Sequence, residues 1–268
     1  MLNKYYKTYK PKKVVMAFDS SSWRKVYTAS DKCISKQPYK GHRRKDMTPG
    51  QRAKYERFLN HIAEFESMID KYTTIITLKE DMLEADDLIA GFIQVYASED
   101  THITLVSTDT DFLQLLKHPN IQIVSPATGK PTLLTEWDND PEFYLFSKCV
   151  KGDKQTDNVW PALPRVHKTR LRKAYTDEFE RIQMMKEKWT NPLGREFVVE
   201  ELFKENQLLI DLEKQPDDIR VKIYTAIERE MDRDRKFSLF FIMKFLGKYK
   251  LTKIIDSIDQ YMPMLSKK

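Results

Sequence analysis

The amino-acid sequence predicts an α/β fold in which a mostly parallel sheet carries helices on both faces and a helical region follows. Over the first half of the chain, short apolar runs with β-branched residues alternate with stretches of helical periodicity, which is typical of parallel sheets. Beyond about residue 140 these runs give way to charged stretches with helical spacing. We therefore expect an N-terminal α/β domain over residues 1–140 and a C-terminal helical domain over residues 141–268.

Four short apolar segments are predicted to form the strands. Each is bounded by polar or turn-forming residues and is too short to count as a buried helix. In chain order they are residues 13–18, 73–78, 102–107 and 121–124.

Helices are expected between and after these strands. Over residues 51–72 apolar side chains recur every three to four positions, which predicts an amphipathic helix. Residues 84–96 begin with carboxylates, which the helix dipole favours, and residues 111–116 suffice for a short helix. Residues 24–50 are basic and interrupted by prolines and glycines, so we expect an irregular segment there. Residues 180–197 are polar enough for a helix with an exposed loop.

Charge is unevenly distributed along the chain. The net charge is +6, yet residues 1–57 hold 16 Lys and Arg against 4 Asp and Glu, and the remainder is net acidic. A basic arm joined to an acidic centre suits a protein that holds a polyanion by its phosphates, although a solvated basic surface explains the same composition.

Composition also bears on the compartment. Cys33 and Cys149 are too few for a disulfide framework, which points to a reducing environment. No apolar run approaches the roughly 20 residues that span a bilayer, and the first residues lack a signal-peptide core. We expect a cytoplasmic protein without a membrane partner.

Carboxylates recur where the predicted strands pass into loops or helices. Asp19 follows the first strand, residues 84–87 (EADD) open a helix, and Asp109 and Asp111 follow the third strand. Ligands collect at the carboxyl ends of strands in open α/β sheets, so these side chains could meet there. Crowded carboxylates repel one another unless hard cations bind between them, which favours Mg²⁺ or Mn²⁺. Helix capping and turn formation explain each group when it is taken alone.

A fourth acidic pair precedes a basic segment. Asp153 and Asp157 are four positions apart, so they are neighbours if the segment is helical. Lys168 and Thr169 stand at a predicted helix start, where backbone N–H groups and a cation would hold a phosphate. An ordinary basic helix is the alternative interpretation.

Taken in order, these segments resemble the 5′-nuclease (flap endonuclease) superfamily, and within it the ribonuclease H branch of T-even bacteriophages. No single segment is specific, but the series is. The segments are FDSS (18–21), YKGHR (39–43), EADDLIA (84–90), VSTDTDFLQLL (106–116) and KGDKQTDNVWPALPRVHKT (151–169).

The resemblance implies a PIN/5′-nuclease-like fold and a two-metal nuclease that hydrolyses RNA primers and DNA 5′ ends during phage DNA replication, in the host cytoplasm. Its substrates would be DNA and RNA–DNA hybrids with a 5′ flap or fork. A single-stranded-DNA-binding protein and a sliding clamp would be partners that contact the C-terminal helices. Two Mg²⁺ ions, for which Mn²⁺ could substitute, would be held by the residues at the family's acidic positions: Asp19, Glu84, Asp86, Asp87, Asp109, Asp111, Asp153 and Asp157.

The resemblance also implies roles for basic side chains. Residues 39–43 match the helical-arch motif, in which Lys40 and Arg43 would stabilise transition-state charge on the scissile phosphate. Residues 157–169 would form a helix–hairpin–helix that holds the duplex. Further nucleic-acid contacts are implied for Tyr39, Arg44, Arg52, Lys54, Arg57, Lys168 and Thr169.

The sequence departs from the family pattern in three places. The family begins with a strand and a metal-binding Asp well before the strand that ends at Asp19, so we expect that first strand to be missing, through a truncated gene model or because another chain supplies it. Residues 152–158 (GDKQTDN) hold one extra residue between the aspartates, which leaves open which of them reaches a metal. The hairpin at residues 159–169 lacks glycines, so no K⁺ site is predicted.

Two other functions stay open on sequence alone. A catalytically impaired protein that recognises forked DNA and recruits replication partners is favoured by the missing ligand and opposed by retention of the other carboxylates. A small PIN-type ribonuclease would share the acidic sheet edge, but it gives no reason for the arch motif or the helical tail.

Overall fold

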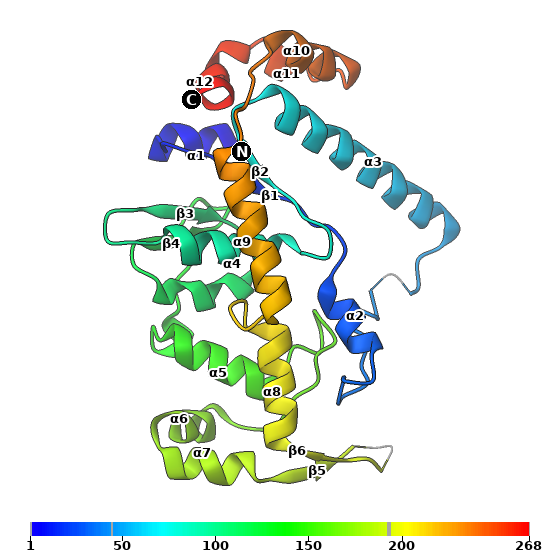
Figure 1. Cartoon of the computed structure of the whole chain (residues 1–268), viewed down its shortest axis with the longest axis vertical. Helices are drawn as coiled ribbons and strands as arrows, with labels where there is room; N and C mark the ends of the chain where they lie inside the picture. The colour runs from blue at the N-terminus through cyan, green and yellow to red at the C-terminus, as the bar shows by residue number, and fades with distance from the viewer. Residues whose placement is uncertain (1, 44, 192–193, 268) are drawn as a thin grey trace. The chain divides into compact units, whose positions relative to one another are not determined.

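The computed structural model describes residues 2–43, 45–191 and 194–267, and the chain divides into two compact units. Unit 1 comprises residues 1–20, 46–88 and 223–268, and unit 2 comprises residues 21–45 and 89–222. Helices α4 (Ala85–Tyr96) and α9 (Asp217–Asp232) each begin in one unit and end in the other. Figure 1 shows the elements coloured along the chain.

Unit 1 is built on a short parallel strand pair. Strand β1 (Val15–Ala17) pairs with β2 (Ile76–Leu78), with Val15 opposite Ile76. Its core joins side chains from the first and last thirds of the chain: Met68, Ile69, Ile75, Ile242, Leu246, Met264 and Leu265. The other elements that lie wholly in unit 1 are α1 (Leu2–Tyr9), α3 (Pro49–Tyr72), α10 (Leu239–Lys248), α11 (Thr252–Ile255), η3 (Ile258–Gln260) and α12 (Met262–Ser266).

Helix α3 confirms the predicted helix but not a continuous buried face. Thr48 caps its start: the Thr48 hydroxyl accepts a hydrogen bond from the Gln51 amide, and the Gln51 side chain accepts one from the Thr48 amide, which stabilises a helix start. Ile69 near the C-terminal end is 3% exposed, whereas Phe58 in the first half is 56% exposed. Helical periodicity therefore predicted the helix correctly, but only its last turns pack into the core.

Unit 2 contains a second parallel strand pair. Strand β3 (Ile103–Val106) pairs with β4 (Ile121–Val124) in a four-residue register, and the 3₁₀ helix η1 (Thr110–Lys117) connects them. The helices around this pair and beyond it are α2 (Trp23–Ala29), η2 (Thr135–Trp137), α5 (Pro141–Lys151), α6 (Lys168–Thr176), α7 (Glu178–Met185) and α8 (Val199–Ile210).

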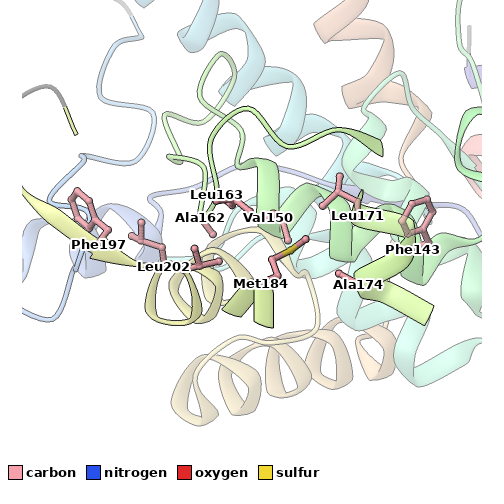
Figure 2. Close-up of a cluster of buried hydrophobic side chains, with 10 residues drawn as sticks. Phe143, Val150, Ala162, Leu163, Leu171, Ala174, Met184, Phe197 and Leu202 are labelled. Atoms are coloured by element: carbon pink, nitrogen blue, oxygen red, sulfur yellow. The ribbon is translucent and has the colours of Figure 1, made fainter. Parts of the chain in front are cut away.

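A large apolar core lies among the later helices of unit 2. Figure 2 shows Val150 of α5, Leu171 of α6, Met184 of α7 and Leu202 of α8 in one cluster. All four side chains are 1% exposed or less, so truncating any one of them would leave a cavity that costs about 2–5 kcal/mol.

Two predictions about secondary structure are wrong. Residues 23–29 form helix α2 inside the segment expected to be irregular, because Arg24 is buried and its Nε donates to the Leu209 carbonyl (2.9 Å). An antiparallel hairpin, β5 (Lys188–Thr190) with β6 (Glu196–Val198), lies where no strands were expected. Trp189 stabilises it by packing against its cross-strand partner Phe197, with the two rings tilted and 5.1 Å between ring centroids.

The predicted α/β class is confirmed, since parallel strands alternate with helices over the first half of the chain. Within the described ranges the strands form separate two-stranded pairs rather than one continuous sheet. Among those same residues, no helix combines the length and the apolar character that a membrane-spanning segment requires.

Candidate metal centre

The acidic residues of unit 1 lie where β1 and β2 end. The strands are parallel, so their carboxyl ends share one edge, and Asp19 leaves β1 beside the loop that leads from β2 into α4. The Ala85 amide donates to Asp19 Oδ1 (2.9 Å), and the Ser20 amide donates to the Leu83 carbonyl (3.2 Å). These bonds hold Asp19 against the start of the EADD segment.

The EADD segment has a capping role at α4. Asp87 is fully buried, and its Oδ2 accepts a hydrogen bond from the Glu84 amide (3.1 Å). Glu84 is also buried, whereas Asp86 is partly exposed. Capping thus engages one oxygen of Asp87 and, through the Ala85 amide, one oxygen of Asp19.

The acidic residues of unit 2 are held by a lysine. Lys148 of α5 lies between Asp111 and Asp153: its Nζ contacts Asp111 Oδ1 and is 3.0 Å from Asp153 Oδ2. The three side chains are only 12%, 17% and 14% exposed. Asp109, on the turn before η1, accepts a hydrogen bond from the Asp111 amide (2.9 Å). One ammonium group therefore neutralises carboxylates that are far apart in sequence.

The electrostatics of this group follow from burial and from that ammonium. Burial alone would lower the pKa of Lys148, but Asp111 and Asp153 reverse this and raise it. Burial raises the pKa of Asp111 despite the opposing effect of Lys148. Asp153 is also partly desolvated, but Lys148 and hydrogen bonds from Thr156 bring its pKa below the usual range. Asp153 is thus a firmly ionised partner of Lys148.

Asp157 anchors the arch motif. The Tyr39 hydroxyl donates to Asp157 Oδ2 (3.0 Å), Arg43 Nη2 donates to Oδ1 (3.0 Å), and Lys40 Nζ lies 3.9 Å from Oδ1. The Asp157 carbonyl accepts from the Lys40 amide (2.8 Å). Burial raises the pKa of Asp157, and Lys40 and Tyr39 oppose the rise. The two cations that were assigned to the scissile phosphate therefore share a carboxylate as their partner.

Gly41 allows the arch motif to fold in this way. A Cβ at this position would lie 2.5 Å from the Pro38 Cγ, closer than real carbon atoms approach. Lys40 itself has a φ of 54°, in the left-handed region that suits tight turns. The YKGHR segment thus has a backbone requirement for glycine between its two cationic side chains.

The remaining nucleic-acid positions are distributed over both units. Arg52, Lys54 and Arg57 are exposed on the first turns of α3. Lys168 begins α6, and its Nζ donates to the Glu136 carbonyl and lies 3.6 Å from Asp138; the adjacent Thr169 is exposed. Arg44 lies outside the described residues.

The donor chemistry fits hard divalent cations, since both acidic sets offer carboxylate oxygens. Within the part of the chain that the structure describes, no three His, Cys, Asp or Glu side chains are grouped in a way that would hold a metal ion. In unit 2, the Lys148 ammonium lies between Asp111 and Asp153, where a metal ion held by these two carboxylates would have to bind. Sequence reasoning missed Lys148, which the sequence shows only as one of several lysines around GDKQTD.

The chain belongs to the 5′-3′ exonuclease family: the family model for the 5′-3′ exonuclease N-terminal resolvase-like domain matches residues 1–140. It is 29% identical over 204 residues to ribonuclease H of Enterobacteria phage T4. That alignment covers 71% of this chain and 62% of the phage T4 protein, so the chain matches less than two thirds of the length of this relative.

Solved structures show the same fold. The phage T5 D15 protein co-crystallised with metal ions superposes with a TM-score of 0.62 at 19% identity, over 85% of this chain and 89% of that one. The phage T5 D15 flap endonuclease in a pseudo-enzyme–product complex with DNA and metal ions gives a TM-score of 0.61 at 18% identity, over 86% and 88%. At this level of identity the similarity establishes the fold.

Proposed function

We propose that the chain is a divalent-metal-dependent 5′-3′ nuclease of the flap endonuclease and ribonuclease H type, acting on RNA primers and DNA 5′ ends during phage DNA replication. The observation that carries the proposal is the match of the 5′-3′ exonuclease family to residues 1–140, in a chain whose carboxylates follow the parallel strands β1 and β3. Such an enzyme would work in the host cytoplasm.

The metal ligands in this proposal are the eight carboxylates at the ends of the strands and in the GDKQTDN loop. Their oxygen-only chemistry favours Mg²⁺, with Mn²⁺ as a substitute. When bound, such ions supply an activated water and stabilise the leaving 3′ oxygen. In unit 2, Asp111 and Asp153 become available as ligands once the Lys148 ammonium moves aside.

Lys40 and Arg43 would bind the phosphate that is to be cut. In the free chain both contact Asp157, so the arrival of a phosphate exchanges one anion for another rather than burying an unpaired charge. Their charge would then stabilise the extra negative charge of the transition state. The Tyr39–Asp157 hydrogen bond (3.0 Å) would keep the base of the arch motif in place during this exchange.

Holding the strand would fall to side chains away from the carboxylates. Arg52, Lys54 and Arg57 project from one exposed part of α3, and they would follow a single-stranded 5′ end by its phosphates. Lys168 and Thr169 at the start of α6 would hold a duplex phosphate after Lys168 releases Glu136.

A single-stranded-DNA-binding protein and a sliding clamp are the proposed protein partners, and the C-terminal helices would be the surface that they contact.

A cleavage assay on a labelled 5′-flap duplex tests the proposal. We expect cutting with Mg²⁺ and none with EDTA, and loss of cutting in Asp86→Asn and Asp109→Asn while both variants still bind the flap. Lys40→Met should slow turnover by about 10²–10³-fold, the typical effect of one transition-state contact, with a smaller effect on binding.

The alternative function makes a different prediction in the same experiment. A forked-DNA-binding protein without catalysis would bind the flap substrate tightly and leave it intact at every Mg²⁺ and Mn²⁺ concentration. That result, obtained with chain shown to be folded by circular dichroism, would refute the nuclease proposal.

A further inference from the structure

A cavity of about 210 Å³ lies within unit 1, and its lining residues include none of the carboxylates described above. It is formed by the segment before β1, the start of β2, the end of α9 with the residues after it, and α12. Its volume is well above the roughly 10–15 Å³ that holds a single water molecule. That is enough for one medium-sized side chain of a ligand and a few ordered waters.

The cavity has an apolar floor. The side chains that form it come from four separate elements or segments, and none carries a charge: Val14, Ile76, Met231 and Met264. Met264 belongs to the unit 1 core and is 6% exposed, and Ile76 of β2 is 7% exposed, so both side chains are held in place by their surroundings. An apolar group that enters the cavity would therefore leave water without requiring the floor to reorganise.

The rim of the cavity is strongly cationic. Lys12, Lys13 and Lys267 line it together with two arginines, and Asp234 is the acidic residue among the lining side chains. Lys12 and Lys13 are exposed, and Lys267 Nζ donates to the carbonyl of Pro11 (2.9 Å). Lysines held at a pocket mouth attract carboxylates and phosphates alike.

The two arginines at the cavity are already partly paired. Arg233 contacts Asp70 (2.9 Å) and Glu230 (3.0 Å), and Arg235 Nη2 contacts Glu230 Oε2 (2.9 Å). The side chain of Arg235 is 5% exposed, and its buried Nε has no hydrogen-bond partner among the residues that the structure describes. A buried donor without an acceptor is costly, so this end of unit 1 carries an unsatisfied cationic group beside the cavity.

We propose that this cavity is the docking site for an acidic polypeptide segment of a partner protein. An apolar side chain of that segment would occupy the floor, and carboxylates beside it would contact Lys12, Lys13 and the Arg235 end. Nucleic acid fits less well, because a phosphate or sugar placed over Val14, Met231 and Met264 would lose hydrogen bonds to water without finding donors there. The proposal stands independently of the nuclease activity.

Fluorescence polarisation with the full chain tests the proposal. The probe is a fluorescein-labelled peptide of sequence Glu-Asp-Glu-Asp-Leu-Phe. The double variant Lys12→Ser/Lys13→Ser should bind it about tenfold more weakly, because the loss of two rim charges removes on the order of one decade of affinity. The matched control Lys244→Ser/Lys253→Ser removes two exposed unit 1 lysines that do not line the cavity, and it should bind as the wild type does.

Changes in the peptide test the apolar floor and the cationic rim of the cavity separately, and they leave the protein itself unaltered. Replacement of Leu-Phe by Ser-Ser should weaken binding about tenfold by removing the group that fills the floor. Raised salt should weaken the remaining binding through screening of the rim lysines.

Three results would overturn the proposal. One is equal affinity of the wild type and the Lys12→Ser/Lys13→Ser variant for the peptide, and another is equal affinity of the Leu-Phe and Ser-Ser peptides. The third is a labelled single-stranded oligonucleotide that depends on Lys12 and Lys13 while the peptide does not bind, which would make the cavity a nucleic-acid site.

Discussion

Substitution of Lys148 by Met would remove the ammonium that lies between Asp111 and Asp153 while keeping a side chain of similar length. Breaking a buried ion pair by removing one partner costs about 3–5 kcal/mol. Since the three side chains keep between 12% and 17% exposure, water screens part of the loss, and we expect the lower end, about 3 kcal/mol, without metal. A divalent cation at about one hundred times its Kd would return about 2.7 kcal/mol.

Urea unfolding followed by circular dichroism, with EDTA or with Mg²⁺, measures both quantities. We expect the variant to be less stable than the wild type in EDTA and to gain more from Mg²⁺, because in the wild type the cation must first displace Lys148. Lys151→Met is the control, since Lys151 is exposed on the same helix. If Lys148→Met is as stable as the wild type in EDTA, or gains no more from Mg²⁺ than Lys151→Met does, the argument that Lys148 occupies a cation position is refuted.

Three further predictions follow from other contacts. Burial holds the pKa of Asp111 and Asp157 above the usual range. The folded chain therefore binds protons at these two carboxylates more readily than the unfolded chain does. Above the raised pKa values the two ionised carboxylates lower the stability of the fold, and this loss disappears as the pH falls through those values. Protons then compete with metal, and a Mn²⁺ titration should show weaker binding at about pH 5 than at about pH 7.5; equal affinities would contradict this. Glu230→Gln removes a buried carboxylate shared by three arginines and should cost about 3 kcal/mol in urea unfolding, a loss under 1 kcal/mol being the contrary result. Ile69→Ala should cost about 2–5 kcal/mol and Phe58→Ser within about 0.5 kcal/mol, and the reverse order would show that the first half of α3 is packed.

Local pattern was enough to predict the strands of the two parallel pairs and the helices α3, α4 and η1. β1, β2, β3 and β4 each lie inside the apolar segment predicted for them. A short apolar run with β-branched residues indicates a strand by itself, without any information about the segments that pack against it. The hairpin β5–β6 was missed because its stability comes from Trp189 and Phe197 meeting across the turn and from a hydrogen bond of Trp189 to the Ala162 carbonyl. Contacts of this kind between separate segments cannot be predicted from a short stretch of sequence.

Local sequence places carboxylates where the strands end, but it does not show which side chains they contact in the folded chain. Carboxylates at strand ends can be read from the sequence because parallel strands place them at a common edge. The partner of Asp111 and Asp153 depends on how helix α5 faces η1, and the sequence shows Lys148 only as one of several lysines near Gly152. The same holds for Asp157, whose contacts with Tyr39 and Arg43 join residues more than 100 positions apart.

The discontinuity of unit 1 has a consequence for biosynthesis. Hydrogen bonds join its early and late segments directly: the Thr74 amide donates to the Leu265 carbonyl (2.9 Å), and the Tyr6 hydroxyl donates to the Pro263 carbonyl (2.9 Å). Residues 1–20 are therefore synthesised well before residues 223–268, and the unit 1 side chains that pack against these last residues stay uncovered until then. Nascent chains stalled before residue 223 should accordingly recruit chaperones, and release past residue 265 should end that dependence.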